Sequence, residues 1–94
     1  MFKELDPILH SSLRLAVISL LVGVKEAEFT FLKEQTGATA GNLSVQLTKL
    51  SEAGYIEITK SFRDNKPLTI CKLSKDGKKA FDAYVEVLKT YIKQ

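Results

Sequence analysis

The chain has 94 residues, of which 45% are hydrophobic and 27% charged, with a formal net charge of +3 at pH 7, the size and balance of one globular domain over residues 1–94. Its one cysteine, Cys71, and one histidine, His10, exclude a disulfide framework and a zinc site, so no metal or other cofactor is expected and a reducing cytoplasm is favoured. The apolar run 15–24 is too short to span a bilayer and follows acidic residues, so we expect neither a membrane span nor a signal peptide.

The first predicted element is a helix that begins at Ser11 or Ser12 and runs to Val24. Pro7 disfavours helix before it, and serine is a good N-cap residue. Apolar residues recur at helical spacing and cover nearly the whole of this segment. Such a helix is expected to be buried on more than one side.

Two further helices are predicted in the next thirty residues. Thr30 is expected to cap a short helix over 31–36, and Gly37 to end it in a left-handed conformation. A third helix, within 39–53, starts at its cap Thr39 and ends before Gly54. Two short helices joined by a glycine-containing turn predict a helix-turn-helix.

The hydrophobic period changes from helical to two after residue 54. A strand is predicted over 55–62, a turn over 64–67 and a second strand over 68–73. These segments form a β-hairpin with a charged tip. Ser74 is expected to open a last helix, with Asp76 in its first turn where a negative charge suits the helix dipole.

Basic residues gather in one stretch of the chain. Residues 1–56 carry five Lys or Arg against six Asp or Glu, residues 57–79 carry seven against three, and residues 80–94 balance. A local basic cluster is the electrostatic footprint of a protein that binds the phosphate backbone of nucleic acid. The same pattern also occurs on ordinary solvated surfaces.

Helix, short helix, turn, helix, hairpin and helix is the element order of a winged helix domain. Segment 39–56 (TAGNLSVQLTKLSEAGYI) resembles the recognition-helix segment of the MarR and ArsR superfamily, and segment 5–15 (LDPILHSSLRL) resembles small stand-alone regulators of archaea and bacteria. The resemblance implies a mainly helical α+β fold that binds double-stranded DNA as a homodimer and regulates transcription without catalysis. Two features depart from the pattern. The metal ligands of ArsR sensors are absent, and Val45 stands where an arginine is frequent.

Candidate DNA contacts follow from the faces of the third helix and from the hairpin, or wing, at 60–69. Leu43, Leu47 and Leu50 share one helix face and are assigned to the core. The small residues at the helix start would allow close approach to the duplex, amides could pair bidentately with adenine, and Val45 could contact a thymine methyl. The candidates are Thr39, Ala40, Gly41, Asn42, Ser44, Val45, Gln46, Thr48 and Lys49 on the helix, and Lys60, Arg63, Asn65 and Lys66 on the wing. The alternatives are that Thr39 only caps its helix and that the wing residues only build a turn.

A long apolar stripe on the last helix predicts a second copy of the chain as a partner. The helix continues beyond what a small core needs, and surplus apolar surface usually finds a partner. The stripe could instead pack across the first helix of its own chain. The dimerisation candidates are Leu5, Ile8 and Leu9 near the start and Phe81, Tyr84, Val85, Leu88, Tyr91 and Ile92 on the helix.

Other functions are weighed against DNA-binding regulation. A winged helix that only binds proteins is the main alternative, although the basic wing argues against it. An enzyme is disfavoured because no phosphate loop, carboxylate pair or nucleophile motif is present. Cys71 is interpreted as a small buried hydrophobic residue rather than a redox sensor, and His10 as a packing or capping residue rather than a switch. No pocket for a small-molecule effector is evident in the sequence.

Overall fold

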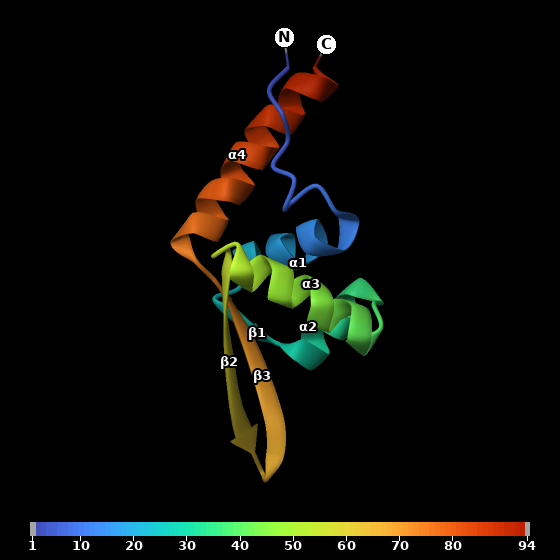
Figure 1. Ribbon diagram of the computed structural model, residues 1–94, viewed down its shortest axis with the longest axis vertical. Coiled ribbons are helices and arrows are strands. Elements are labelled where there is room, and N and C mark those ends of the chain that lie inside the picture. The colour runs from blue at the N-terminus through green and yellow to red at the C-terminus, as the bar shows by residue number, and fades with distance from the viewer. Residues whose placement is uncertain (1, 94) are drawn as a thin grey trace.

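The computed structural model describes residues 2–93, in which helices and strands follow one another in the predicted order with one additional strand (Figure 1). The helices are α1 Ser12–Gly23, α2 Phe29–Thr36, α3 Ala40–Glu52 and α4 Lys75–Ile92, and the strands are β1 Glu26–Glu28, β2 Ile56–Arg63 and β3 Lys66–Leu73. The predicted mainly helical α+β fold is confirmed.

Local capping chemistry explains where the helices begin and end. Hydroxyl oxygens of Ser11, Thr39 and Ser74 accept hydrogen bonds from the backbone N–H three residues later, at 3.4, 3.2 and 2.9 Å. Gly37 and Gly54 have φ of 72° and 80°, the left-handed conformation that ends α2 and α3. The predicted boundaries of α1, α3 and α4 are therefore confirmed to within one or two residues.

The start of α2 was predicted wrongly. The helix begins at Phe29 and its N-cap residue is Glu28, whose side chain makes no capping hydrogen bond. Thr30 therefore lies inside the first turn and does not cap it. Strand β1 ends at Glu28 and the helix follows at once, so the chain is already helical at Thr30.

The hairpin is part of a three-stranded antiparallel sheet in the order β1-β3-β2, rather than the isolated two-stranded wing that was predicted. Asp64 and Asn65 both have positive φ, 52° and 63°. This is the two-residue turn whose twist matches its flanking strands. The turn is thus shorter than predicted, and Lys66 and Pro67 belong to β3, where they pair with Arg63 and Phe62.

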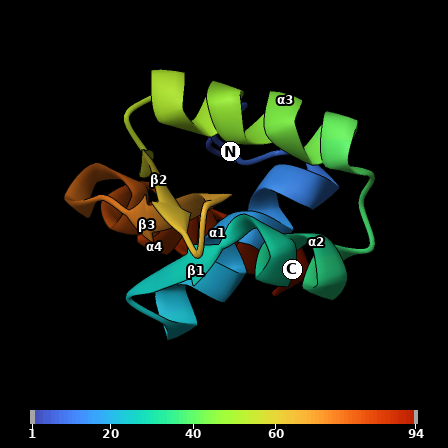
Figure 2. The ribbon, with the colours of Figure 1, turned by 90° about the horizontal axis from the view of Figure 1, so that it is seen from below.

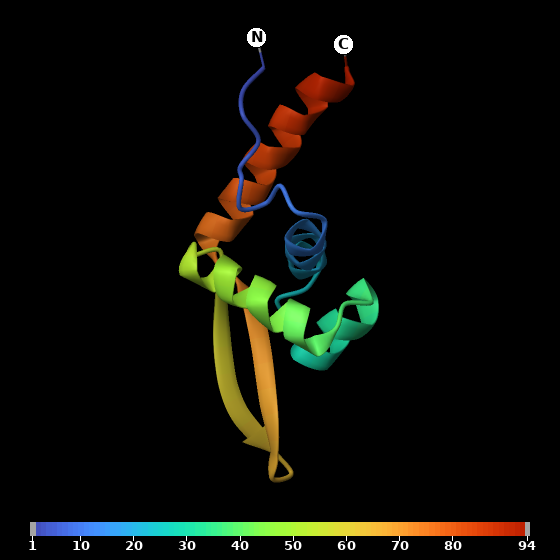
Figure 3. The same ribbon diagram turned by 45° about the vertical axis from the view of Figure 1, so that its right-hand side comes forward.

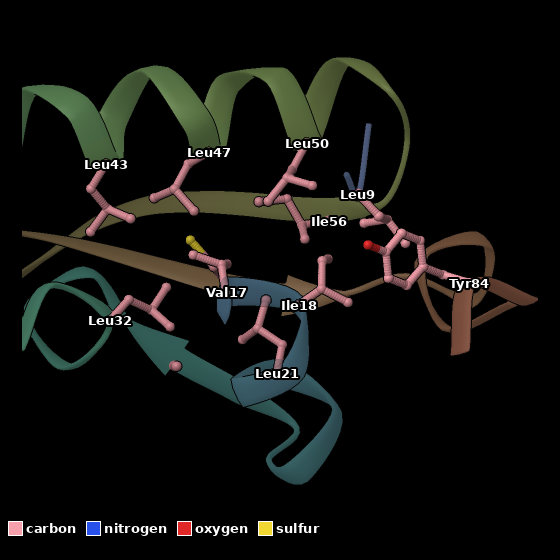
Figure 4. Packing of buried hydrophobic residues seen from close by; sticks show 12 residues of the cluster. Leu9, Val17, Ile18, Leu21, Leu32, Leu43, Leu47, Leu50, Ile56 and Tyr84 are labelled. Carbon is pink, nitrogen blue, oxygen red and sulfur yellow. The ribbon is translucent and has the colours of Figure 1, made fainter. Parts of the chain in front are cut away.

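The core lies between α1, α3 and the base of the sheet (Figure 4). The three leucines of α3 that were assigned to the core are at most 2% exposed. They belong to one buried cluster with residues of α1 and with Cys71 of β3. The buried cluster consists of Leu9, Val17, Ile18, Leu21, Ala27, Leu32, Leu43, Leu47, Leu50, Ile56, Cys71 and Tyr84.

Two parts of the molecule project from this core in opposite directions (Figures 1 and 3). The β2-β3 hairpin extends from one end, and α4 extends from the other with the N-terminal segment running beside it. The resulting body measures 54 × 25 × 21 Å. The fold therefore separates the hairpin tip from the outer end of α4.

Candidate DNA-binding interface

The outer face of α3 is open to solvent along its whole length. Viewed from below, the helix lies across the molecule with its outer side uncovered by any other element (Figure 2). Because its three leucines anchor the inner side, the other residues are turned outward. Of the predicted contacts, only Gln46 is half-buried, and Val45 is 52% exposed. The exposed ones are Thr39, Ala40, Gly41, Asn42, Ser44, Val45, Thr48 and Lys49.

Lys60 lies on the face of the hairpin that turns toward α3. It lies two and four residues after Ile58 and Ile56 on β2, and because successive side chains of a strand point to opposite faces, the three share one face. A shallow cavity of about 190 Å³ between helix and hairpin has Ser44, Thr48 and Lys60 in its lining. The structure thus brings one predicted wing cation beside two predicted helix residues.

Phe62 occupies the same face of β2 farther toward the tip, and its exposed fraction of 75% is unusual for a phenylalanine. Pairing in an antiparallel sheet places it beside Pro67. The sequence assigned Phe62 only to the end of a strand. Its exposure depends on how far the hairpin projects, and strand periodicity does not report that distance.

Arg63 and Lys66 pair with each other across the hairpin on the opposite face from Lys60. The Arg63 guanidinium donates to both carboxylate oxygens of Glu28, at 2.7 and 3.2 Å. The bond with Glu28 raises the pKa of Arg63. Arg63 therefore remains charged, but its charge is matched by a neighbouring carboxylate.

Lys60, Asn65 and Lys66 are exposed and make no side-chain hydrogen bond or ion pair within residues 2–93. The wing thus offers two unpaired cations and one amide. The partner of Arg63 is 35 residues away in the sequence, in the strand that sequence periodicity did not reveal. The four predicted wing residues therefore differ in electrostatic state, since only Arg63 is paired with a carboxylate.

Arg14 of α1 is a residue that sequence reasoning did not select. Its Nη1 donates to Oε1 of Gln46 at 2.5 Å, and Nε2 of Gln46 donates to Oδ1 of Asn42 at 3.1 Å. The same guanidinium donates through Nε to the carbonyl of Ile8 at 2.6 Å and through Nη2 to that of Pro7 at 3.5 Å. The feature of the sequence that could have pointed to Arg14 is that it is charged, whereas the other residues of α1 are uncharged and mostly apolar.

The N-terminal segment and α4 pack together at the end farthest from the wing. Phe2 stacks on Tyr91 with ring centroids 4.6 Å apart, and the Tyr91 hydroxyl donates to the carbonyl of Lys3 at 2.7 Å. Leu5 and Ile8 are half-buried against the core. These contacts place the two predicted dimerisation segments side by side.

The prediction that Leu9 and Tyr84 belong to the dimer surface was wrong. They are 0% and 5% exposed within the single chain, so neither offers surface to a partner. The Tyr84 hydroxyl lies 3.2 Å from Nδ1 of His10, which is itself an exposed residue. In contrast, Ile92 is 73% exposed. Val85 is half-buried but belongs neither to the core cluster nor to the residues packed against it, so the edge of α4 that carries Val85 and Ile92 is the part of the stripe turned away from the core.

Two other ionisable groups of the described region have raised pKa values. Burial raises the pKa of the Cys71 thiol to about 11, so the thiol stays protonated at neutral pH. The Tyr55 hydroxyl donates to Asp6 at 2.5 Å, which raises its pKa to about 12. Residues 2–93 contain no cluster of three or more His, Cys, Asp or Glu side chains suited to a metal ion. Among their helices, none has the length and hydropathy to cross a membrane.

Two solved structures of other proteins share this fold. A solved structure of a transcriptional regulator homologue from Pyrococcus horikoshii OT3 matches with a TM-score of 0.85 at 24% identity, over 92% of this chain and 85% of that one. A MarR mutant from E. coli in complex with operator DNA matches with a TM-score of 0.76 at 17% identity, over 94% of this chain and 62% of that one. The fold is thus that of MarR-like regulators.

Sequence comparison agrees with this likeness of fold. An uncharacterized protein of Methanocaldococcus jannaschii is 39% identical over 78 residues, which are 83% of this chain and 85% of that protein. The family model of the winged helix DNA-binding domain matches residues 13–92. The chain therefore belongs to the winged helix DNA-binding domain family.

Proposed function

We propose that the protein is a sequence-specific DNA-binding regulator of transcription that acts as a homodimer, with no chemical step of its own. The observation that carries the proposal is the uncovered outer face of α3, fixed from behind by its buried leucines, beside a projecting hairpin with two unpaired lysines. The fold shared with a MarR protein that was solved on operator DNA supports it.

In this proposal α3 enters the major groove. Its first residues, Thr39, Ala40 and Gly41, are small and exposed, so the start of the helix can approach the duplex closely. Val45 offers an apolar contact to a thymine methyl, and Lys49 a contact to phosphate. Ser44 is proposed to donate a hydrogen bond to the duplex from the side that faces the wing. The Thr48 hydroxyl already donates to the Ser44 carbonyl at 3.0 Å, so Thr48 is proposed to accept from the duplex or to contact it through its methyl group.

The wing is proposed to follow the DNA backbone or the minor groove. Lys60 and Lys66 provide unpaired positive charge, and Asn65 at the turn provides a donor. Arg63 joins them by exchanging the Glu28 carboxylate for a phosphate, a ligand of the same charge sign and similar geometry. Contacts of this kind position a protein on DNA without reading its sequence.

The dimer is proposed to form through the outer end of the molecule. The apolar edge of Val85 and Ile92 on α4, with Leu88 and Phe81 beside it and the N-terminal residues Leu5 and Ile8 nearby, forms the contact. Because the hairpins lie at the opposite end, pairing at α4 leaves both recognition helices free. A second copy supplies a second recognition helix, which reads a second half-site on the duplex.

A winged helix that binds only protein is the second candidate, and the exposed Phe62 on the wing favours it. The salt dependence of DNA binding separates the two, because the release of counterions from phosphates makes affinity for duplex fall steeply with salt. For a 30-base-pair duplex followed by fluorescence anisotropy, we expect binding at 50 mM salt and a loss on the order of 10³-fold by 200 mM. Absence of binding at low salt, or binding insensitive to salt, would favour the protein-binding candidate.

Replacement of a wing lysine tests the role of the wing separately. Lys66→Ala should weaken binding to every duplex by a similar factor and make the slope of log affinity against log salt shallower by about 1, because one phosphate contact is lost. Lys89→Ala removes the same charge from α4, where Lys89 pairs with Glu86, and should leave the slope unchanged. A change in base preference caused by Lys66→Ala would instead make the wing a reader of bases.

A further inference from the structure

The outer half of the wing is a ribbon of only two strands. Strand β1 pairs with β3 as far as Ile70, so between that residue and the tip only β2 and β3 remain. Every residue from 59 to 67 is exposed. Figures 1 and 3 show this part of the hairpin standing clear of the helices. The outer ribbon is therefore accessible to a partner.

The two faces of this ribbon carry different chemistry. Residues that are paired directly across an antiparallel ladder share a face, so Phe62 and Pro67 lie side by side. Lys60 precedes Phe62 by two residues and lies on the same face, which turns toward α3. Arg63 and Lys66 are on the opposite face. The side of the wing that faces α3 thus ends in an apolar pair with a lysine behind it.

Phe62 contributes little to the stability of the single chain. Its exposed fraction is 75%, and its cross-strand neighbour Pro67 is exposed as well. Phe62 belongs neither to the core cluster nor to the side chains packed against it, and it stacks on no other ring within residues 2–93. A large apolar side chain held at the end of a projecting hairpin is therefore available for an external contact.

The surroundings of Phe62 favour DNA over a protein as that contact. Within 59–67, Phe62 and Pro67 are the only apolar residues, and three cations stand against one carboxylate. A protein interface is built around a desolvated apolar centre, which two side chains among three cations do not supply. In contrast, one apolar side chain is enough to enter between two base pairs of a duplex, and the cations suit its phosphates.

We propose that Phe62, backed by Pro67, is a wedge that enters the minor groove next to the α3 site, unstacks one base step in each half-site and bends the operator. Apolar wedges of this kind bend a duplex toward its major groove. With α3 in the major groove, the face that carries Phe62 turns toward the same duplex, and Lys60 is placed to hold a phosphate beside the opened step. The proposal rests on the proposed function and adds DNA bending to it.

A wedge also selects sequence without contacting base edges. Pyrimidine–purine steps such as TA and CA unstack easily, whereas A-tracts are stiff. Each half-site is therefore expected to carry a pyrimidine–purine step where Phe62 enters. Replacing that step by a stiff A-tract step should weaken binding of the wild type about tenfold.

Two fluorescence signals on the operator selected by the wild type report the bend and the wedge separately. Energy transfer between dyes at the two ends of the duplex should rise on binding, corresponding to a bend of about 20–90°. 2-Aminopurine, placed at each adenine in turn, fluoresces more strongly when it is unstacked. Its signal should rise several-fold at one step in each half-site and stay unchanged elsewhere.

Variants of Phe62 assign these signals to its side chain. Phe62→Ala should bind without either signal and distinguish flexible from stiff steps by less than about twofold. Phe62→Leu keeps an apolar wedge and should retain both signals. Phe31→Ala is the matched control, because Phe31 is also exposed, at 39%, but lines a cavity with Ile70 on the other face of the sheet. It should behave as the wild type.

The outcomes separate this proposal from the proposed function. Wild-type protein that binds its operator with neither signal would overturn the wedge and leave DNA-binding regulation intact. So would a Phe62→Ala variant that bends and unstacks the operator as the wild type does. Failure of the wild type to bind any duplex at low salt would overturn both and leave Phe62 to a protein partner.

Discussion

The double variant Val85→Glu/Ile92→Glu is expected to sediment as a monomer, to keep its far-UV circular dichroism, and to lose on the order of 10³-fold in affinity for its operator. The two residues form the edge of α4 that is turned from the core, and Ile92 is 73% exposed in the single chain. Charges there leave the intrachain core intact but put unpaired carboxylates into an apolar contact between copies. Specific affinity falls because one recognition helix reads only half of the site.

A charge-matched control lies on the same helix. Ala83→Glu/Thr90→Glu adds two carboxylates with the same seven-residue spacing on the exposed opposite side of α4. It should remain a dimer. Wild-type protein that sediments as a monomer at micromolar concentration would contradict the proposed dimer. Global unfolding of Val85→Glu/Ile92→Glu would assign this edge to the intrachain core.

Gly77→Ala is expected to destabilise the protein by about 3 kcal/mol, although alanine is usually about 1 kcal/mol better than glycine inside a helix. A Cβ at position 77 would overlap the Tyr55 carbonyl oxygen and lie 2.8 Å from Cδ1 of Leu73. That carbonyl also accepts from the Ser74 N–H at 3.1 Å, so moving it would disturb the start of α4. The close approach of backbone to backbone here fixes where α4 leaves the sheet.

Gly41→Ala is the control for the intrinsic preference of a helix for alanine over glycine. It lies in the first turn of α3, and a Cβ there would meet nothing within 4 Å. Its free energy of unfolding should stay equal or rise by up to about 1 kcal/mol. Urea unfolding measures both variants. Equal stability of Gly77→Ala and wild type would show that α4 can shift away from Tyr55 without loss.

Elements whose signals are local could be predicted from the sequence. The caps at Ser11, Thr39 and Ser74 and the glycines after α2 and α3 each act within four residues, and the structure confirms them. The inward leucines of α3 follow from helical period alone. With these elements in place, the outer face of α3 and the tip of the hairpin are determined, and most predicted DNA contacts are found there.

Features that depend on distant partners could not be predicted. β1 has the sequence Glu-Ala-Glu, with weak strand preference and only three residues, and it forms because β3 offers an unpaired edge. The Glu28–Arg63 pair joins that strand to the wing across 35 residues, and Arg14 meets Gln46 across 32. Burial of Leu9 and Tyr84 arises likewise from segments that meet only in the folded chain.

Selection from a pool of random duplexes by the full-length wild type, followed by footprinting of the enriched sequence, tests sequence-specific binding by a dimeric winged helix most directly. We predict an inverted repeat whose half-sites are centred about one helical turn, or a small multiple of it, apart, with protection on one side of the duplex. Enrichment of no sequence, or of a single unrepeated site bound by one copy, would contradict this account.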